Sequence, residues 1–401
     1  MATKRALLQF SLFFILYELT VYLSNDMIMP GMPLVVSQFN GSSRHIALSL
    51  SLYIFGGSLL QVVLGPLAER YGKRRVLLCG NALFLVATAL VPFAQTMPQF
   101  LTIRFFQGMG SCFIFLGYAT IHELFDDVQA VKLTTLFSNT TVFAPLIGPV
   151  VGSAIIAVAP WQAVFVTAFA LGLIAWIGLW RSMPGPAAPP QPTSLQAIAA
   201  SYRRILSNRT FMFGIFIAGI SITPLTAWIG LSPAIVLQRM QQPYSVYIAY
   251  QCVIFTGFIL STVAIQRMGD QISLTRLIRQ GGALALIGMA GAGIVHAHPH
   301  LYIGCMFVFS AGFGLFNGAL VRLSLTATGE SMSLTSSAMS LLYCVYIAIG
   351  LELFNLLCER FEYALSAYAL ANVPLGIVIY LSLLRFARTH DSRQAVLQGA
   401  T

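Results

Sequence analysis

The chain has 401 residues, of which 8% are charged and 57% hydrophobic, and its mean hydropathy is +0.81. Soluble domains carry roughly 25% charged residues, so this composition excludes a water-soluble globular fold. The net charge of +10 could suggest a nucleic-acid ligand. However, most lysines and arginines fall in loops on one side of the expected topology, as they do in the cytoplasmic loops of membrane proteins. We therefore expect no nucleic-acid partner, and both termini in the cytoplasm.

Apolar stretches separated by short polar breaks recur from residue 7 to residue 388. A helix of about 20 apolar residues crosses a bilayer, whereas the strands of a membrane barrel would alternate over about ten residues. The continuous stretches predict an all-α membrane protein with twelve transmembrane helices. The predicted spans are 7–37, 44–66, 75–94, 98–121, 131–158, 161–181, 209–239, 243–267, 274–296, 299–328, 333–358 and 361–388.

The first span contains two carboxylates, Glu18 and Asp26, and is too long for a cleaved signal peptide, so we expect a retained helix. Eight positions place the two groups about 80° and about 12 Å apart along a helix. An ionisable side chain at the bilayer centre costs about 2.5 to 3.5 kcal/mol on insertion scales, so such groups usually face a cavity and act in transport. Glu18 could instead extend toward water at the membrane surface.

The loop between the second and third spans combines glycines with a cluster of charges, namely Gly65, Glu69, Arg70, Gly72 and Arg74. Glycine permits tight turns and close helix contacts, and a carboxylate near a helix end can pair with cations. We interpret this loop as a cytoplasmic latch that gates one conformation. An ordinary basic cytoplasmic loop is the alternative.

Arg104 in the fourth span is expected at the depth of Asp26. Burial favours a neutral carboxyl, whereas a nearby arginine favours the carboxylate, so a group between these influences can take up and release a proton. Asp26, Glu18 and Arg104 are therefore the candidate proton-coupling residues, with a static ion pair between Asp26 and Arg104 as the alternative. Arg322 and Glu352 lie in later spans, where coupling and purely structural roles are both open.

The fifth span contains Gly148, Pro149 and Gly152, which predict a kink or a close helix contact that we assign to gating. The proline-rich segment 182–208 cannot cross a membrane, so it divides the chain into a six-helix half at 1–181 and another at 209–401. Arg70-Tyr71-Gly72 and Arg267-Met268-Gly269 follow corresponding spans of the two halves and weakly suggest a duplication.

A pocket for lipophilic molecules needs apolar and aromatic walls with a few polar groups. The candidate binding residues, each of which could instead serve helix packing, are Tyr22, Asn25, Asp26, Trp228, Gln251 and Phe255. Six cysteines lie singly in apolar spans and predict no metal site. We expect no metal, no cofactor other than protons, no enzymatic activity and a monomer, although a receptor or membrane-embedded enzyme is an alternative class.

Several stretches resemble the MdfA-type multidrug/proton antiporters of the major facilitator superfamily. The matching segments are Leu16 to Tyr22, Asn25 to Ile28, Pro30-Gly31, the loop at 65–75, Arg104 to Gly108, Gly148 to Gly152, Ala227 to Ile229, Ser232-Pro233 and Leu320 to Leu323. One departure is Glu69, where the family usually has aspartate. Gly148-Pro149 followed by Gly152 resembles the family's antiporter motif.

The resemblance implies two six-helix halves with a substrate site between them near the bilayer midplane. It further implies export of lipophilic cations or neutral drugs, such as chloramphenicol, in exchange for protons across a bacterial inner membrane. Glu18 and Asp26 would recognise protons and substrate, and Arg104 would couple to them. An exporter of one endogenous metabolite or siderophore is the alternative within transport, whereas the antiporter-like motif of the fifth span argues against a symporter.

Overall fold

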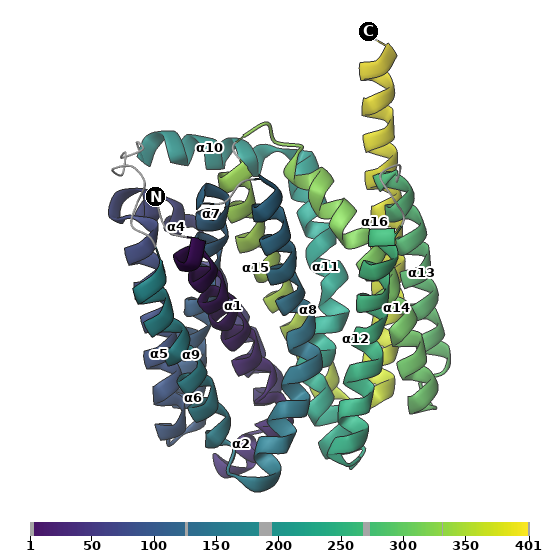
Figure 1. Ribbon diagram of the computed structural model, residues 1–401. Coiled ribbons are helices and arrows are strands. Elements are labelled where there is room, and N and C mark those ends of the chain that lie inside the picture. The colour runs from purple at the N-terminus through teal and green to yellow at the C-terminus, as the bar shows by residue number, and fades with distance from the viewer. Residues whose placement is uncertain (1–3, 125–126, 184–194, 268–272, 331, 400–401) are drawn as a thin grey trace. The chain divides into compact units, whose positions relative to one another are not determined.

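The computed structural model describes residues 4–124, 127–183, 195–267, 273–330 and 332–399, and these residues form helices and no strands (Figure 1). The chain divides into two compact units, Met1–Ser201 and Tyr202–Thr401. The boundary between the units falls inside the segment 182–208 that the prolines mark in the sequence. Each unit is described separately below.

The first unit is built from membrane-length helices interrupted by short turns. Its elements are α1 (Lys4–Asp26), η1 (Met29–Gly31), α2 (Met32–Gln38), α3 (Arg44–Leu59), α4 (Gln61–Tyr71), α5 (Lys73–Leu90), η2 (Val91–Phe93), α6 (Met97–Met109), η3 (Gly110–Phe113), α7 (Ile114–Leu124), α8 (Asp127–Val158) and α9 (Gln162–Ser182), and the boundary to the second unit falls within α10 (Leu195–Ser207).

The second unit has fewer and longer helices. They are α11 (Arg209–Ser232), η4 (Pro233–Arg239), α12 (Tyr244–Arg267), α13 (Leu274–Ile294), α14 (Pro299–Leu325), α15 (Met332–Arg360) and α16 (Leu365–Gly399). Asn208 and Ser273 cap α11 and α13, because their side-chain oxygens accept hydrogen bonds from the backbone N–H three residues later.

Eleven helical stretches within the described part of the chain are long and apolar enough to cross a membrane. They correspond to all the predicted spans except the fifth. That span lies in α8, in which the described apolar stretch is the shorter segment Phe143–Val158. The prediction of an all-helical, multi-pass membrane protein is confirmed.

The first predicted span is interrupted where the sequence suggested one continuous helix. Helix α1 ends at Asp26, and the 3-10 turn η1 at Met29–Gly31 follows before α2 begins. Pro30 lacks the N–H that would continue the hydrogen-bond ladder, which accounts for a break at this point. The break leaves Asp26 at the end of a helix, inside the membrane-spanning stretch.

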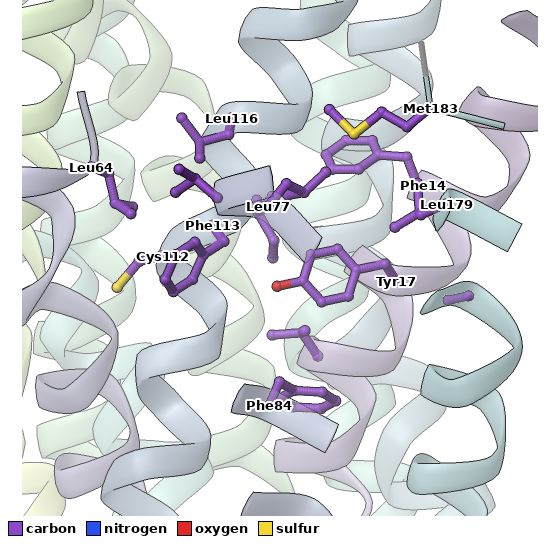
Figure 2. Packing of buried hydrophobic residues seen from close by; sticks show 14 of the residues in the cluster. Phe14, Tyr17, Leu64, Leu77, Phe84, Cys112, Phe113, Leu116, Leu179 and Met183 are labelled. Atoms are coloured by element: carbon purple, nitrogen blue, oxygen red, sulfur yellow. The ribbon is translucent and has the colours of Figure 1, made fainter. Parts of the chain in front are cut away.

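An aromatic core holds α1 against its neighbours in the first unit. Phe14 and Tyr17 on α1 pack with Phe84 of α5 and Phe113 of η3, and Figure 2 shows the Tyr17 ring lying between these elements. The Tyr17 hydroxyl donates a hydrogen bond of 2.6 Å to the Gly110 carbonyl oxygen, so this buried polar group is satisfied. The core therefore fixes how α1 lies in the unit.

Helix α10 in the segment 182–208 was not predicted. Its Ile205 is fully buried in an apolar cluster with Phe211 and Ile215 of α11 and Ala338 of α15. Arg204 on the exposed face of α10 forms an ion pair of 2.5 Å with Glu330, which raises the pKa of the Arg204 guanidinium. An amphipathic helix thus extends along one end of the second unit.

Candidate functional site

Arg104 on α6 is fully buried and is the centre of a polar network inside the first unit. Its guanidinium donates to the Gln107 side-chain oxygen at 2.5 Å, to the Asn25 side-chain oxygen at 2.5 Å and, through Nε, to the Ser49 hydroxyl at 3.2 Å. The guanidinium carbon also lies 4.6 Å from the centre of the Tyr53 ring. A buried arginine is stable only when its donors are satisfied, and this one draws partners from three helices.

Two further hydrogen bonds extend the network to α5. Gln107 donates from Nε2 to the Thr88 hydroxyl at 2.9 Å, and Thr88 donates to the Phe84 carbonyl oxygen at 2.7 Å. Both polar atoms of the Gln107 amide are therefore hydrogen-bonded, Oε1 to Arg104 and Nε2 to Thr88. The bond to Thr88 fixes the orientation of the oxygen that accepts from Arg104. The network joins α1, α3, α5 and α6 around one positive charge.

Asn25 connects Arg104 to Asp26. The Asn25 oxygen accepts from Arg104, while its Nδ2 donates to the Asp26 carboxylate at 3.1 Å. Among the described residues no ion pair joins Asp26 directly to Arg104, so the countercharge expected from the sequence acts through the Asn25 amide. Asp26 and Asn25 are 6% and 8% exposed, which leaves a narrow approach to a buried charge.

Glu18 forms a second, separate carboxylate position on α1. It is fully buried, and its Oε1 accepts a hydrogen bond of 2.7 Å from the Tyr118 hydroxyl on α7. Its Oε2 has no hydrogen-bond partner among the described residues. A buried carboxyl with an unpaired oxygen is costly as an anion, and protonation relieves that cost.

The glycines of α8 pack directly on the end of α1 that carries Asp26. A methyl group at Gly148 would lie 2.5 Å from Cβ of Asp26, and one at Gly152 would overlap the carbonyl oxygen of Met27. Pro149 lies between them inside α8, in a helix that also contains Pro145. Gly148, one of the residues predicted to gate, is therefore in contact with the residue predicted to carry protons, and Gly152 packs on the next residue, Met27.

The loop predicted to act as a latch contains a backbone conformation that glycine adopts readily. Gly72 has φ +84° and separates α4 from α5. The Arg70 guanidinium lies 5.3 Å from the Tyr71 ring centre, and Arg74 donates to the Trp180 carbonyl oxygen at 2.6 Å. Gly65 and Glu69 fall within α4, but beyond the backbone they lie outside the described residues.

In the second unit, Trp228 lies in an aromatic group with residues from α14 and α16. Its ring centre is 5.9 Å from those of Tyr302 and of Tyr368. Gln251 on α12 donates to Ser232, one turn beyond Trp228, at 2.7 Å. The indole N–H of Trp228, the hydroxyl of Tyr302 and the side-chain oxygen of Gln251 are buried without a hydrogen-bond partner in the described structure.

The other predicted residues are less closely connected. Phe255 is buried one turn after Gln251, and Tyr22 is half-buried one turn before Asp26. Glu352 accepts from Asn355 at 3.3 Å, whereas Arg322 is exposed in the last turn of α14 and has no ion-pair partner among the described residues. Neither the structural nor the coupling interpretation of Arg322 is favoured by these contacts.

Sequence reasoning missed four residues that contact Arg104 or Glu18. Gln107 follows Arg104 at i+3, where side chains on a helix meet, so its role could have been found from spacing. Ser49 and Tyr53 are one turn apart on α3, but no local pattern links them to Arg104. Tyr118 meets Glu18 across 100 positions of sequence, so only the fold reveals this contact.

Comparison with known proteins agrees with the all-helical fold. Residues 14–351 match the family model described as Major Facilitator Superfamily. The chain is 38% identical over 356 residues to a protein of Yersinia pestis bv. Antiqua (strain Angola) named "Multidrug transporter MdfA", with 87% of each chain covered. It is 35% identical over 396 residues to the protein of that name from Edwardsiella ictaluri (strain 93-146), covering 96% and 95% of the two chains.

Solved structures with the same fold are more distant in sequence. A D-xylose-proton symporter matches with a TM-score of 0.75 at 15% identity and covers 94% of this chain and 97% of its own. A bacterial homologue of the human lysosomal transporter Spinster matches with a TM-score of 0.75 at 14% identity, covering 97% and 98%. From the family model and these relatives, we conclude that the chain belongs to the major facilitator superfamily of membrane transporters.

Proposed function

We propose that this chain exports small lipophilic molecules in exchange for protons by alternating access. The names of its relatives support multidrug export, and the site supports the coupling. The observation that carries the proposal is the bridge from Arg104 through Asn25 to the buried carboxylate of Asp26. Ionisable groups buried inside membrane spans commonly act as proton relays, so this bridge is a suitable place for proton binding to influence substrate and conformation.

The bridge gives a physical route from proton binding to substrate release. With Asp26 ionised, the Asn25 amide donates to its carboxylate and accepts from Arg104, so the two charges compensate each other. Protonation removes the negative charge and leaves Arg104 uncompensated, which disfavours a lipophilic cation nearby. A neutral drug needs only to favour a different conformation from the one that the proton favours.

The energetics permit useful export. One inward proton provides about 2.3 kcal/mol per 100 mV of membrane potential and about 1.36 kcal/mol per pH unit. For a neutral drug exchanged with one proton, the sum sustains a concentration ratio of several hundredfold. Chloramphenicol and lipophilic cations such as ethidium are suitable test substrates.

We assign the remaining candidate residues to proton binding, drug binding and gating according to the chemistry of their side chains. Glu18 has one oxygen without a partner in the described part of the chain and serves as a second position for a proton or a cationic group. The aromatic group around Trp228 and the unpaired oxygen of Gln251 offer stacking and hydrogen bonding to a drug. Gly148 and Gly152 let α8 follow the movement of α1 next to Asp26. Gly65, Glu69, Arg70, Gly72 and Arg74 complete the proposed gating set.

The proposed setting is the bacterial inner membrane, with both termini in the cytoplasm, where most of the basic residues would then lie. We propose a monomer that uses protons as its only coupling ion and binds small molecules and lipid, with no metal, other cofactor or nucleic acid.

The test uses acidified everted membrane vesicles that contain the full chain and a pH-sensitive dye. Adding chloramphenicol or ethidium should dissipate the pH gradient when Asp26 is intact and should not do so with Asp26→Asn. Vesicles without the protein correct for passive drug effects, and immunoblotting matches the amounts of the variants. If neither drug changes the signal at good expression, multidrug export is refuted and endogenous metabolites become the substrates to screen.

A further inference from the structure

A groove on the first unit lies where α1 begins and α9 ends, away from the Arg104 network. It has a volume of about 380 Å3. Gln9 and Phe13 of α1 line one side, and Ile174, Ile177 and Arg181 of α9 line the other. None of these residues belongs to the proton or drug site described above.

The floor of the groove is apolar and closely packed. The Phe13 ring lies directly on Gly178, where an added methyl group would overlap it. Ser182 turns its hydroxyl back to the Gly178 carbonyl oxygen at 2.6 Å, so it presents no free donor. The side chain of Ile174 is 53% exposed within a membrane-length helix, which leaves an apolar wall open to acyl chains.

One end of the groove is positively charged. Arg181, in the last turn of α9, is exposed and has no hydrogen-bond or ion-pair partner in the described part of the chain. Arg74 approaches the same helix end, because its Nη2 lies 2.6 Å from the Trp180 carbonyl oxygen. Arginine offers five donors in a planar fork, so both groups retain donors for an anion.

An exposed tryptophan, Trp180, marks this helix end as a membrane–water boundary. Trp176 and Trp180 stack with their ring centres 5.9 Å apart, and the Trp180 side chain is 55% exposed. Tryptophan is enriched at the headgroup level of bilayers, where its apolar ring and N–H are both accommodated. The arginines are therefore at the depth at which lipid phosphates lie, and the apolar groove extends from there toward the hydrocarbon.

We propose that this groove binds one anionic phospholipid, with its phosphate at Arg181 and an acyl chain along Phe13 and Ile174. The charge of the site selects an anionic headgroup over a zwitterionic one, since basic residues near a membrane attract anionic lipids. The apolar wall selects a lipid over a soluble phosphate. A bound lipid would also cover the contact between α1 and α9.

Native mass spectrometry of the purified full chain tests the proposal by measuring the affinity for the first added lipid. Phosphatidylglycerol should bind more tightly than phosphatidylcholine with the same acyl chains. Arg181→Gln should weaken phosphatidylglycerol binding by about fivefold, the effect expected from one basic residue. The matched control is Arg267→Gln, because Arg267 is likewise exposed in the last turn of a membrane-length helix and should leave the affinity unchanged.

Two further arms separate a lipid site from an anion site. Ile174→Trp, at an exposed position, should narrow the groove and weaken phosphatidylglycerol binding, whereas glycerol phosphate in millimolar amounts should not displace the lipid. The proposal is overturned if phosphatidylcholine binds equally well, if Arg181→Gln or Ile174→Trp binds like the parent protein, or if glycerol phosphate competes. Equal thermal melting of all variants excludes unfolding as the cause of any loss.

Discussion

Replacing Gly148 by alanine places one methyl group into the contact between α8 and α1. The added carbon would lie 2.5 Å from Cβ of Asp26 and 3.1 Å from its carbonyl carbon. Carbon atoms pack best at about 3.5 to 4.0 Å, so α8 and the end of α1 must separate by about 1 Å. Overpacking of this kind costs about 1 to 3 kcal/mol.

The cost falls on conformations in which the two helices are in contact. Destabilising such a conformation by about 1 to 3 kcal/mol lowers its equilibrium population by about 5- to 150-fold. We therefore expect Gly148→Ala to lower drug-driven proton exchange in proteoliposomes by at least about fivefold. Every amino acid other than glycine carries a Cβ atom. We therefore expect no substitution at position 148 to retain the parent transport rate.

A glycine without neighbours provides the control. Gly318 in α14 has open space around the position of an added methyl group, so Gly318→Ala introduces no overlap and should favour the helix slightly. Transport rate and melting temperature are measured for both variants at matched protein amounts. A parent-like rate and melting temperature for Gly148→Ala would refute the close contact between α8 and Asp26.

Three further substitutions test individual contacts. Arg104→Lys keeps the charge but loses the planar fork that reaches three partners, so exchange should fall more than tenfold, as measured by dye in vesicles; a rate within twofold of the parent would contradict the network. Tyr118→Phe removes the only hydrogen bond to Glu18 in the described structure and should lower stability by about 1 to 3 kcal/mol, because the buried carboxyl loses its partner in either protonation state; an unchanged melting temperature would contradict this contact. Trp228→Phe deletes an indole N–H that has no partner in the described structure and also removes part of a buried ring, so the melting temperature should fall because of the cavity, and drug affinity, measured by ligand binding, should decrease as well; unchanged drug affinity would show that Trp228 only packs.

The sequence predicts the membrane spans well because hydropathy depends on composition along a single helix. The interruption after Asp26 is less apparent, since Pro30 is also compatible with a kinked continuous span. Helix α10 was missed because the prolines of the segment 182–208, which all precede the helix, led us to interpret the whole segment as a linker. Its residues Ile198 and Ile205 are seven positions apart, on one helical face, and both are buried.

The sequence predicted which charged residues belong to the candidate site, but not the hydrogen bonds and packing contacts that join them. Ionisable groups inside apolar spans are evident from the sequence, which is why Asp26 and Arg104 could be named together. The role of Asn25 as a bridge depends on the directions of three side chains, and spacing does not determine these. The contact of Gly148 with Asp26 likewise depends on how α8 crosses α1, although the glycine pattern indicated some close approach.

The central claim is that the Asp26 carboxyl exchanges its proton for drug. Purified protein in weakly buffered detergent solution, near neutral pH and with no membrane gradient, allows this step to be measured directly as protons released on addition of ethidium. The account predicts release that saturates with drug for the parent protein and is lost in Asp26→Asn. Release of the same amplitude from a folded Asp26→Asn variant would contradict it and would assign the exchanged proton to another group.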